Sequence, residues 1–298
     1  MTKLNSTYVD GTGQSHRPDG RIHTSFQNTV TATGRLSSTE PNLQNIPVRT
    51  ELGAELRKMF VAPAGSVLVD ADYSQIELRL LAHIAGDEQM IAAFRTGEDI
   101  HTVTASQVFG VPPEQVTHEM RRRAKAVNFG IVYGISAFSL SARTSALPWR
   151  RPRSIWRSTF EHYSGVHAYM DPGGGAGQGR RLCVHPHGPP PVAAGAQVLQ
   201  LQYLRSFGER VALNMPIQGT AADIIKLAML RVDGRLRREG LEARLVLQVH
   251  DELIVECPEG EAEQVQRLLA EEMEHVAELA VPLTAEAHAG KSWAEAKG

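Results

Sequence analysis

Two aspartates stand where predicted strands end, and carboxylates at such positions can be held rigidly. Asp72 closes the apolar run 66–73, and Asp251 lies between the short apolar runs 244–249 and 253–257. Hard divalent cations prefer carboxylate oxygens, so the two side chains could share metal ions if the fold brings them together. An acid at a strand end is more often a solvated turn residue, and spacing alone leaves both interpretations open.

A second set of residues combines positive charge with aromatic rings. Arg121, Lys125, Phe129 and Tyr133 follow one another in steps of four, which places them along one face of a helix. An Arg fork and a Lys ammonium suit phosphate oxygens, and an aromatic ring stacks on any nucleobase. The row therefore suits a nucleoside triphosphate, although a helix with a basic start and a buried aromatic end is the alternative.

The elements that must position these residues indicate an α+β chain. The run 66–73 predicts a strand, and apolar residues from 76 to 85 recur at helical spacing. Ser74 and Glu77 predict a capping box at the start of that helix. The runs around Asp251 predict a hairpin with acids at its tip. The first fifty residues predict loops and short extended pieces, and the remaining elements are expected as helices at 120–133, 222–236 and 262–279 and a strand at 282–287.

Composition narrows the class of protein. The formal net charge is −2, which gives no general sign of nucleic-acid binding. No apolar run reaches the roughly 20 residues of a membrane-spanning helix, and the first residues do not resemble a secretory signal, so a cytoplasmic protein is expected. Cys183 and Cys257 are far apart and lack metal-ligand spacing, which predicts two buried thiols. Positive residues still form local clusters that can bind phosphate, at 121–125, 143–157, 180–181 and 205–210.

Three segments together resemble the polymerase motifs of bacterial family A DNA polymerases, and they occur in the family's order. They are the octapeptide 72–79 that begins Asp-Tyr-Ser-Gln, the helix from Arg121 to Gly134, and Gln248-Val249-His250-Asp251-Glu252. Further segments are similar at 33–38, 41–47, 99–102 and 214–223.

The resemblance implies the right-hand polymerase fold, with an antiparallel-sheet palm and a helical fingers insertion. It assigns residues 1–79 to the first part of the palm, with the connection from the thumb at its start, 80–204 to the fingers and 205–298 to the second part of the palm. The chain then corresponds to a C-terminal polymerase portion, and the thumb is expected to be missing from it.

The implied activity is that of a DNA-directed DNA polymerase, a nucleotidyltransferase of DNA replication and repair. Two Mg²⁺ ions would be held by Asp72, Asp251 and the Tyr73 carbonyl, with Glu252 as a supporting carboxylate, for two-metal transfer of a deoxynucleotide to the primer 3′-hydroxyl. The implied partners are primer-template DNA and deoxynucleoside triphosphates, with no membrane partner, and the chain is expected to act as a monomer.

Other roles follow from the same resemblance. Arg121, Lys125 and His101 would contact the triphosphate, and Lys125 would also donate a proton to pyrophosphate. Phe129 and Tyr133 would close over the new base pair. Gln75 would bind the nucleotide, and Glu77 would crowd the sugar 2′ position. The DNA duplex would be contacted by Arg35, Asn42, Gln44, Asn45, Arg205, Asn214, Gln218 and His250.

Two blocks depart from the family pattern. Residues 142–159 and 172–203 are rich in Arg, Pro and Gly and show no usable periodicity, whereas orderly sequence returns between them at 160–170. Our interpretation is that both blocks are translated out of frame through compensating insertions and deletions. An inactive DNA-binding remnant of a damaged gene is therefore an alternative to the enzyme. A two-metal nuclease is a further alternative, which the Arg121 row argues against because hydrolysis needs no triphosphate grip.

Overall fold

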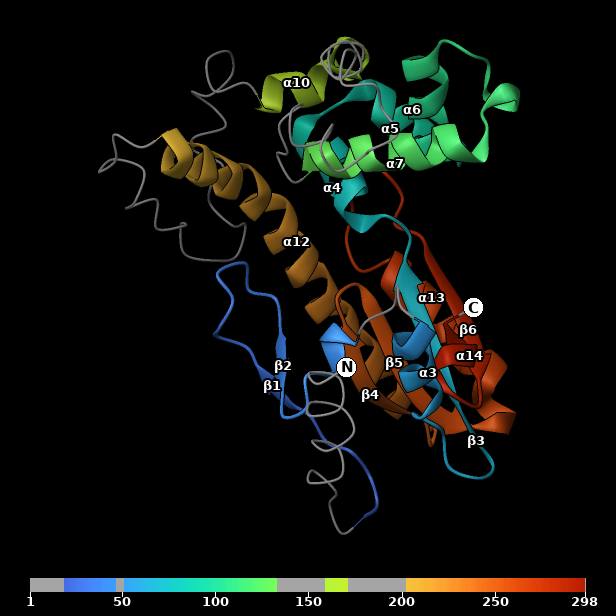
Figure 1. Ribbon diagram of the computed structural model, residues 1–298. Coiled ribbons are helices and arrows are strands. Elements are labelled where there is room, and N and C mark those ends of the chain that lie inside the picture. The colour runs from blue at the N-terminus through green and yellow to red at the C-terminus, as the bar shows by residue number, and fades with distance from the viewer. Residues whose placement is uncertain (1–18, 47–50, 133–158, 171–201, 298) are drawn as a thin grey trace. The chain divides into compact units, whose positions relative to one another are not determined.

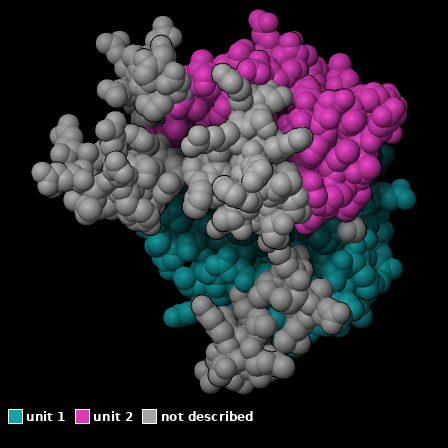
Figure 2. All heavy atoms as spheres, turned by 45° about the horizontal axis from the view of Figure 1, so that its top comes forward, with its two compact units in different colours: residues 1–74, 222–277, 283–298 teal, residues 75–221, 278–282 magenta. Residues whose placement is uncertain are grey.

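The computed structural model describes residues 19–46, 51–132, 159–170 and 202–297 (Figure 1). Nearly all of the two suspected out-of-frame blocks lies outside the described residues, as do Tyr133 and Cys183. The chain divides into two compact units (Figure 2). Unit 1 comprises residues 1–74, 222–277 and 283–298, and unit 2 comprises residues 75–221 and 278–282.

A four-stranded antiparallel sheet forms the centre of unit 1. Its strands are β3 (Ser66–Tyr73), β4 (Arg244–Val249), β5 (Glu252–Pro258) and β6 (Ala285–Gly290), in the order β4-β5-β3-β6. The strand β3 is paired on both edges, with β5 and with β6, and most of its residues are buried. The predicted strand 66–73 and the predicted hairpin are confirmed.

One face of the sheet packs against α13 (Ala262–Glu274). Val69 and Ala71 of β3 are fully buried on this side, as are Leu268 and Leu269 of the helix. The Tyr73 hydroxyl donates a hydrogen bond of 2.7 Å to the Met273 carbonyl. The burial of these alternate strand residues leaves Leu68, Asp70 and Asp72 on the opposite face, since successive side chains of a strand alternate.

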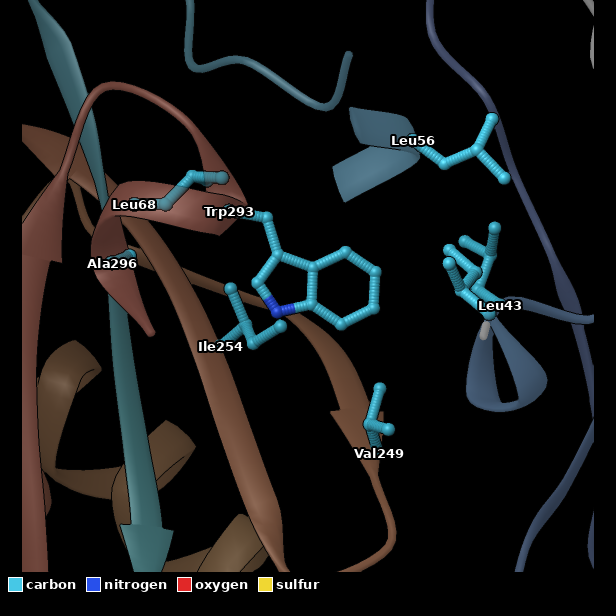
Figure 3. Close-up of a cluster of buried hydrophobic side chains, with 8 residues drawn as sticks. Leu43, Leu56, Leu68, Val249, Ile254, Trp293 and Ala296 are labelled. Carbon is cyan, nitrogen blue, oxygen red and sulfur yellow. The ribbon is translucent and has the colours of Figure 1, made fainter. Parts of the chain in front are cut away.

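The opposite face carries an apolar cluster at one end. Trp293 of α14 (Trp293–Ala296) lies among Leu68, Val249 and Ile254 of the sheet, with Leu56 of α3 (Glu51–Lys58) beside it (Figure 3). The Trp293 side chain is 1% exposed. This cluster anchors the last helix of the chain to the sheet.

The remaining elements of unit 1 are short, apart from the end of a long helix. The hairpin of β1 (Ser25–Gln27) and β2 (Ser37–Thr39) is followed by the 3-10 turn η2 (Leu43–Asn45). The turn η4 (Glu259–Glu261) precedes α13. Residues 222–238 are the end of α12 (Gln202–Arg238), which contains the predicted helix 222–236 and begins twenty residues before it.

Unit 2 is helical in its described residues. A glycine in the left-handed backbone conformation follows each of the helices α4 (Ile76–Ala85), α5 (Glu88–Thr96) and α6 (Ile100–Phe109). Aspartate side chains cap the starts of α5 and α6. The turn η3 (Pro113–Gln115) leads to α7 (His118–Val132), which matches the predicted helix 120–133, and α10 (Ser164–Met170) lies in the predicted orderly segment 160–170.

Three expectations about element ends are wrong. The helix α4 begins at Ile76, and its N-cap is Gln75 in the left-handed conformation, without a side-chain capping hydrogen bond. Ser74 is therefore not the N-cap that the predicted capping box requires, and its backbone N–H donates to the Thr284 carbonyl at 2.9 Å. The helix α13 ends at Glu274 instead of 279, and β6 spans 285–290 instead of 282–287.

The other sequence-level expectations concern thiols and membrane helices. Cys257 is a free, buried thiol, as predicted. None of the helices in the described ranges combines the length and the apolar character that crossing a membrane would require.

Candidate functional site

Carboxylates from β3 and β5 meet at one end of the unit 1 sheet. Asp72 and Glu252 are direct partners in the antiparallel register. Asp251 stands beside them at the tip of the hairpin, where the Tyr73 N–H donates to the Asp251 carbonyl at 3.1 Å. The left-handed conformation of His250, with φ of 53°, forms the tight turn. The fold therefore brings Asp72 and the hairpin tip together, which spacing alone left open.

A lysine from the end of the chain contacts two of these carboxylates. The Lys297 Nζ lies 2.9 Å from Asp72 Oδ2 and also contacts Glu252 Oε2. The Glu252 side chain is 6% exposed, compared with 41% for Asp72. Lys297 was not predicted from the sequence, because its sequence separation from both partners is long and it belongs to no motif.

Asp70 adds a further carboxylate to this face of the sheet. It lies two residues before Asp72 and is 2% exposed. Burial raises the pKa of Asp70 to about 6; the positive charge of Lys297 opposes the increase, and the negative charge of Asp72 adds to it. Sequence reasoning missed Asp70, although the period of two along a strand places it on the same face as Asp72.

Arg57 brings a second positive charge from α3. Its guanidinium carbon lies 4.4 Å from the centre of the Trp293 ring, a cation–π geometry. Burial lowers the pKa of Arg57, and the charges of Asp70 and Asp72 oppose this decrease. The carboxylates of this face are thus balanced by cations from α3 and from the residue that follows α14.

The oxygens of the site are suited to a hard cation. A cavity of about 140 Å³ is lined by Asp70, Asp72, Tyr73, Ser74, Glu286, His288 and Lys297. In the part of the chain that the structure describes, no three His, Cys, Asp or Glu side chains are already arranged as a metal site. Asp72 Oδ1 and Glu252 Oε1 are nevertheless buried without a hydrogen-bond partner among those residues. Such oxygens fit Mg²⁺, which binds through one or two carboxylates and keeps other ligands from water or substrate.

The cationic and aromatic row lies in unit 2, on α7. Arg121, Lys125 and Phe129 share one side of the helix, and the Lys125 Nζ is 5.9 Å from the centre of the Phe129 ring. Arg121 forms a two-pronged ion pair with Asp99, with Nε–Oδ2 and Nη2–Oδ1 distances of 2.6 and 3.2 Å. Burial would raise the pKa of Asp99, but hydrogen bonds from Arg121 and Thr102 outweigh it and lower this pKa to about 2.

His101 is packed beneath this row. Its side chain is 2% exposed, its Nδ1 lies 3.0 Å from Asn128 Nδ2, and its ring centre lies 6.1 Å from that of Phe129. Burial lowers the pKa of His101 to about 4, with Asp99 opposing the decrease and Lys125 and Arg121 adding to it. The imidazole is therefore neutral at pH 7. Two other predicted nucleotide residues lie at the start of α4, where Gln75 is the N-cap and Glu77 is 8% exposed.

The residues expected to contact DNA are divided between the two units. In unit 1, Gln44 Nε2 donates to the carbonyl and side-chain oxygens of Gln248 at 3.2 and 3.1 Å, and Asn42 caps η2. Arg35 is partly exposed, and Asn45 and His250 are exposed. In unit 2, Asn214 and Gln218 are partly exposed on α12, whereas the side chain of Arg205 lies outside the described residues.

Comparison with known proteins identifies the class. The sequence model of DNA polymerase family A matches residues 1–295, so the chain belongs to that family of polymerases. Curated relatives are bacterial DNA polymerase I proteins. The thermostable enzyme of Thermus thermophilus is 49% identical over the whole chain, and that of Caldicellulosiruptor bescii is 46% identical over 99% of it. In each case the chain spans 35% of the relative's length.

A solved structure shows the same fold. It is the POL domain of Pol1 from M. smegmatis in complex with DNA primer-template and dNTP, with 43% identity and a TM-score of 0.91. The match covers all of this chain and 52% of that one. The mixed helical and antiparallel-sheet architecture is therefore that of a polymerase domain.

Proposed function

We propose that the chain catalyses template-directed addition of deoxynucleotides to a primer 3′-hydroxyl, as a DNA-directed DNA polymerase of DNA replication and repair. The observation that carries the proposal is the meeting of Asp72, Glu252 and the Asp251 turn at one end of an antiparallel sheet. Family membership supports it, and so does the solved relative, which was seen with primer-template and dNTP.

The residues of unit 1 would bind metal. Asp72 and Asp251, with the Tyr73 carbonyl, would hold two Mg²⁺ ions, and Glu252 would support them from its buried position. When bound, the two ions would activate the primer hydroxyl and stabilise the charge that develops on the transferred phosphoryl group and on pyrophosphate. The rigid register of β3 and β5 would keep the carboxylates in place through the reaction.

The residues of unit 2 would bind the nucleotide. Arg121 and Lys125 would neutralise the triphosphate, with Lys125 placed to protonate pyrophosphate, and Phe129 and Tyr133 would stack at the new base pair. His101 would act as a neutral hydrogen-bonding group, because its low pKa leaves it uncharged at pH 7. Gln75 would contact the nucleotide, and Glu77 would crowd the sugar 2′ position.

The finer division of the fold belongs to the same proposal. Residues 1–79 and 205–298 would form a palm and 80–204 would form fingers. The residues already named for DNA would contact the primer-template through phosphates and minor-groove edges without reading its sequence. The chain would act as a cytoplasmic monomer.

Primer extension on a short template with Mg²⁺ and four deoxynucleotides tests the proposal. Asp72→Asn and Asp251→Asn should each slow extension by at least about 100-fold, since each removes a ligand charge worth several kcal/mol in the transition state. Asp233→Asn, on the partly exposed side of α12, is the matched control and should leave the rate unchanged. Equal rates for Asp72→Asn and the control, or no extension by the folded wild-type chain, would contradict the proposal.

A further inference from the structure

Lys297 is held in a defined position at the end of the chain. The Ser292 hydroxyl accepts a hydrogen bond from the Glu295 N–H, which caps the short helix α14. The Lys297 N–H in turn donates to the Trp293 carbonyl at 3.2 Å. Because Trp293 is buried in the apolar cluster, the backbone of Lys297 is anchored to the sheet face that carries the carboxylates.

The ammonium of Lys297 bridges carboxylates from two strands. It contacts Asp72 on β3 and Glu252 on β5, which are opposite each other in the ladder. The Glu252 side chain is nearly inaccessible to water, and a buried carboxylate is costly unless an opposite charge or a hydrogen bond compensates it. Lys297 supplies that compensation when no metal ion is bound.

The other cation of this face is less well placed for the same task. Arg57 stacks on Trp293, and its Nε and Nη1 atoms lack hydrogen-bond partners among the described residues. Among the described residues, Arg57 forms no ion pair with Asp72 or Glu252, so the direct charge contact of these two carboxylates comes from Lys297.

We infer that Lys297 is a built-in counter-ion of the Asp72–Glu252 pair, and that it weakens the site for divalent cations while it stabilises the metal-free fold. The inference rests on the proposed function, in which Asp72 is a metal ligand. An ammonium bound to Asp72 Oδ2 must move when that oxygen is used by a divalent cation, and its positive charge repels the incoming one. Lys297 is thus a positioning residue that sets metal affinity.

Binding of Mn²⁺ to the 298-residue chain without DNA measures this effect directly, by calorimetry or by electron paramagnetic resonance of the free ion. Lys297→Gln should bind Mn²⁺ about three- to tenfold more tightly than wild type, because it removes both the competitor and its charge. Lys297→Arg keeps the charge and should stay within about twofold. Lys291→Gln is the matched control, since Lys291 forms an exposed pair with Glu259 in the same segment and should not change the affinity.

Thermal unfolding in EDTA provides a second measurement. Lys297→Gln should lower the melting temperature by about 2–4 °C relative to Lys291→Gln, because the buried Glu252 loses its counter-charge. Saturating Mn²⁺ should remove most of this difference, since it binds the same carboxylates.

Asp72→Asn distinguishes a failure of the proposed metal site from a failure of the counter-ion role of Lys297. If Asp72→Asn loses Mn²⁺ affinity but Lys297→Gln binds no more tightly than wild type, the counter-ion role is wrong and the metal site of the proposed function stands. If Asp72→Asn binds Mn²⁺ as wild type does, the metal site is wrong and the counter-ion role fails with it. A melting temperature for Lys297→Gln in EDTA equal to that of Lys291→Gln would also overturn the inference.

Discussion

The buried His101 predicts a specific pH dependence of stability. Its pKa falls from 6.5 to about 4 on folding, chiefly because burial disfavours the charged ring. Above pH 6.5 the ring is neutral in both the folded and the unfolded chain. Between about pH 6.5 and pH 4 the unfolded chain binds a proton that the folded chain does not, so stability is lost as the pH falls. Below that window both states are protonated.

The size of the loss follows from the change in pKa. At about 1.4 kcal/mol for each tenfold change in proton affinity, His101 should cost the folded state about 3 kcal/mol across the window. His101→Asn is a suitable variant because its side-chain oxygen can accept the hydrogen bond that Asn128 Nδ2 makes to His101 Nδ1. The variant leaves a cavity and should be less stable than wild type at neutral pH.

Urea unfolding followed by circular dichroism at several pH values measures the effect. As the pH falls from 6.5 to 4, the free energy of unfolding of wild type should fall by about 3 kcal/mol relative to that of His101→Asn. The stability advantage of wild type at neutral pH should therefore shrink or change sign. His118→Asn, at an exposed position that starts α7, should give a profile parallel to that of wild type. Parallel profiles for wild type and His101→Asn would show that the ring is not held neutral by burial.

Three further substitutions test packing and charge. Gly165→Ala should destabilise the chain by about 1–3 kcal/mol in urea unfolding, because a Cβ there would lie 2.8 Å from the Asp87 Cα. Gly234→Ala, inside α12 with room for a Cβ, should instead stabilise it by about 0.5–1 kcal/mol in the same assay. Asp99→Asn keeps a residue that can cap α6 but weakens the ion pair with Arg121, which leaves Arg121 freer to bind phosphate. The KM for dNTP in primer extension should therefore fall by up to about fivefold. An unchanged KM would show that this ion pair does not compete with the triphosphate.

The sheet of unit 1 could largely be predicted from the sequence. The strands β3 and β4 match the predicted runs because each is rich in Val and Leu, which favour strands. The start of β6 could not be predicted, since its pairing with β3 selects residues 285–290 and moves the strand three residues past the local apolar run. The position of the helix cap has a similar cause, because Ser74 still pairs with Thr284 and the N-cap of α4 is Gln75, one residue later.

Some residues of the candidate site could likewise be predicted from the sequence, and others could not. The sequence places Asp72 and Asp251 at the ends of predicted strands, with Glu252 next to Asp251, but only the register of β3 and β5 brings Asp72 to the hairpin tip. Asp70 follows from the period of the strand. Lys297 could not, because nothing local links it to residues 225 and 45 positions away. The ion pair between Asp99 and Arg121 is likewise set by the packing of α6 against α7 and not by either helix alone.

One face of β3 is apolar at one end and acidic at the other. Leu68 belongs to the apolar cluster, whereas Asp70 and Asp72 on the same face are acids, one of them buried. Carboxylates so close to an apolar core raise the energy of the folded state unless cations are brought to them. Trp293 contributes both to the apolar cluster and to the placement of the cations. Its ring fills the cluster and stacks on Arg57, and its carbonyl accepts the hydrogen bond from the Lys297 N–H. The C-terminal turn is therefore part of the core and part of the site at once, and a substitution of Trp293 should disturb metal binding and stability together.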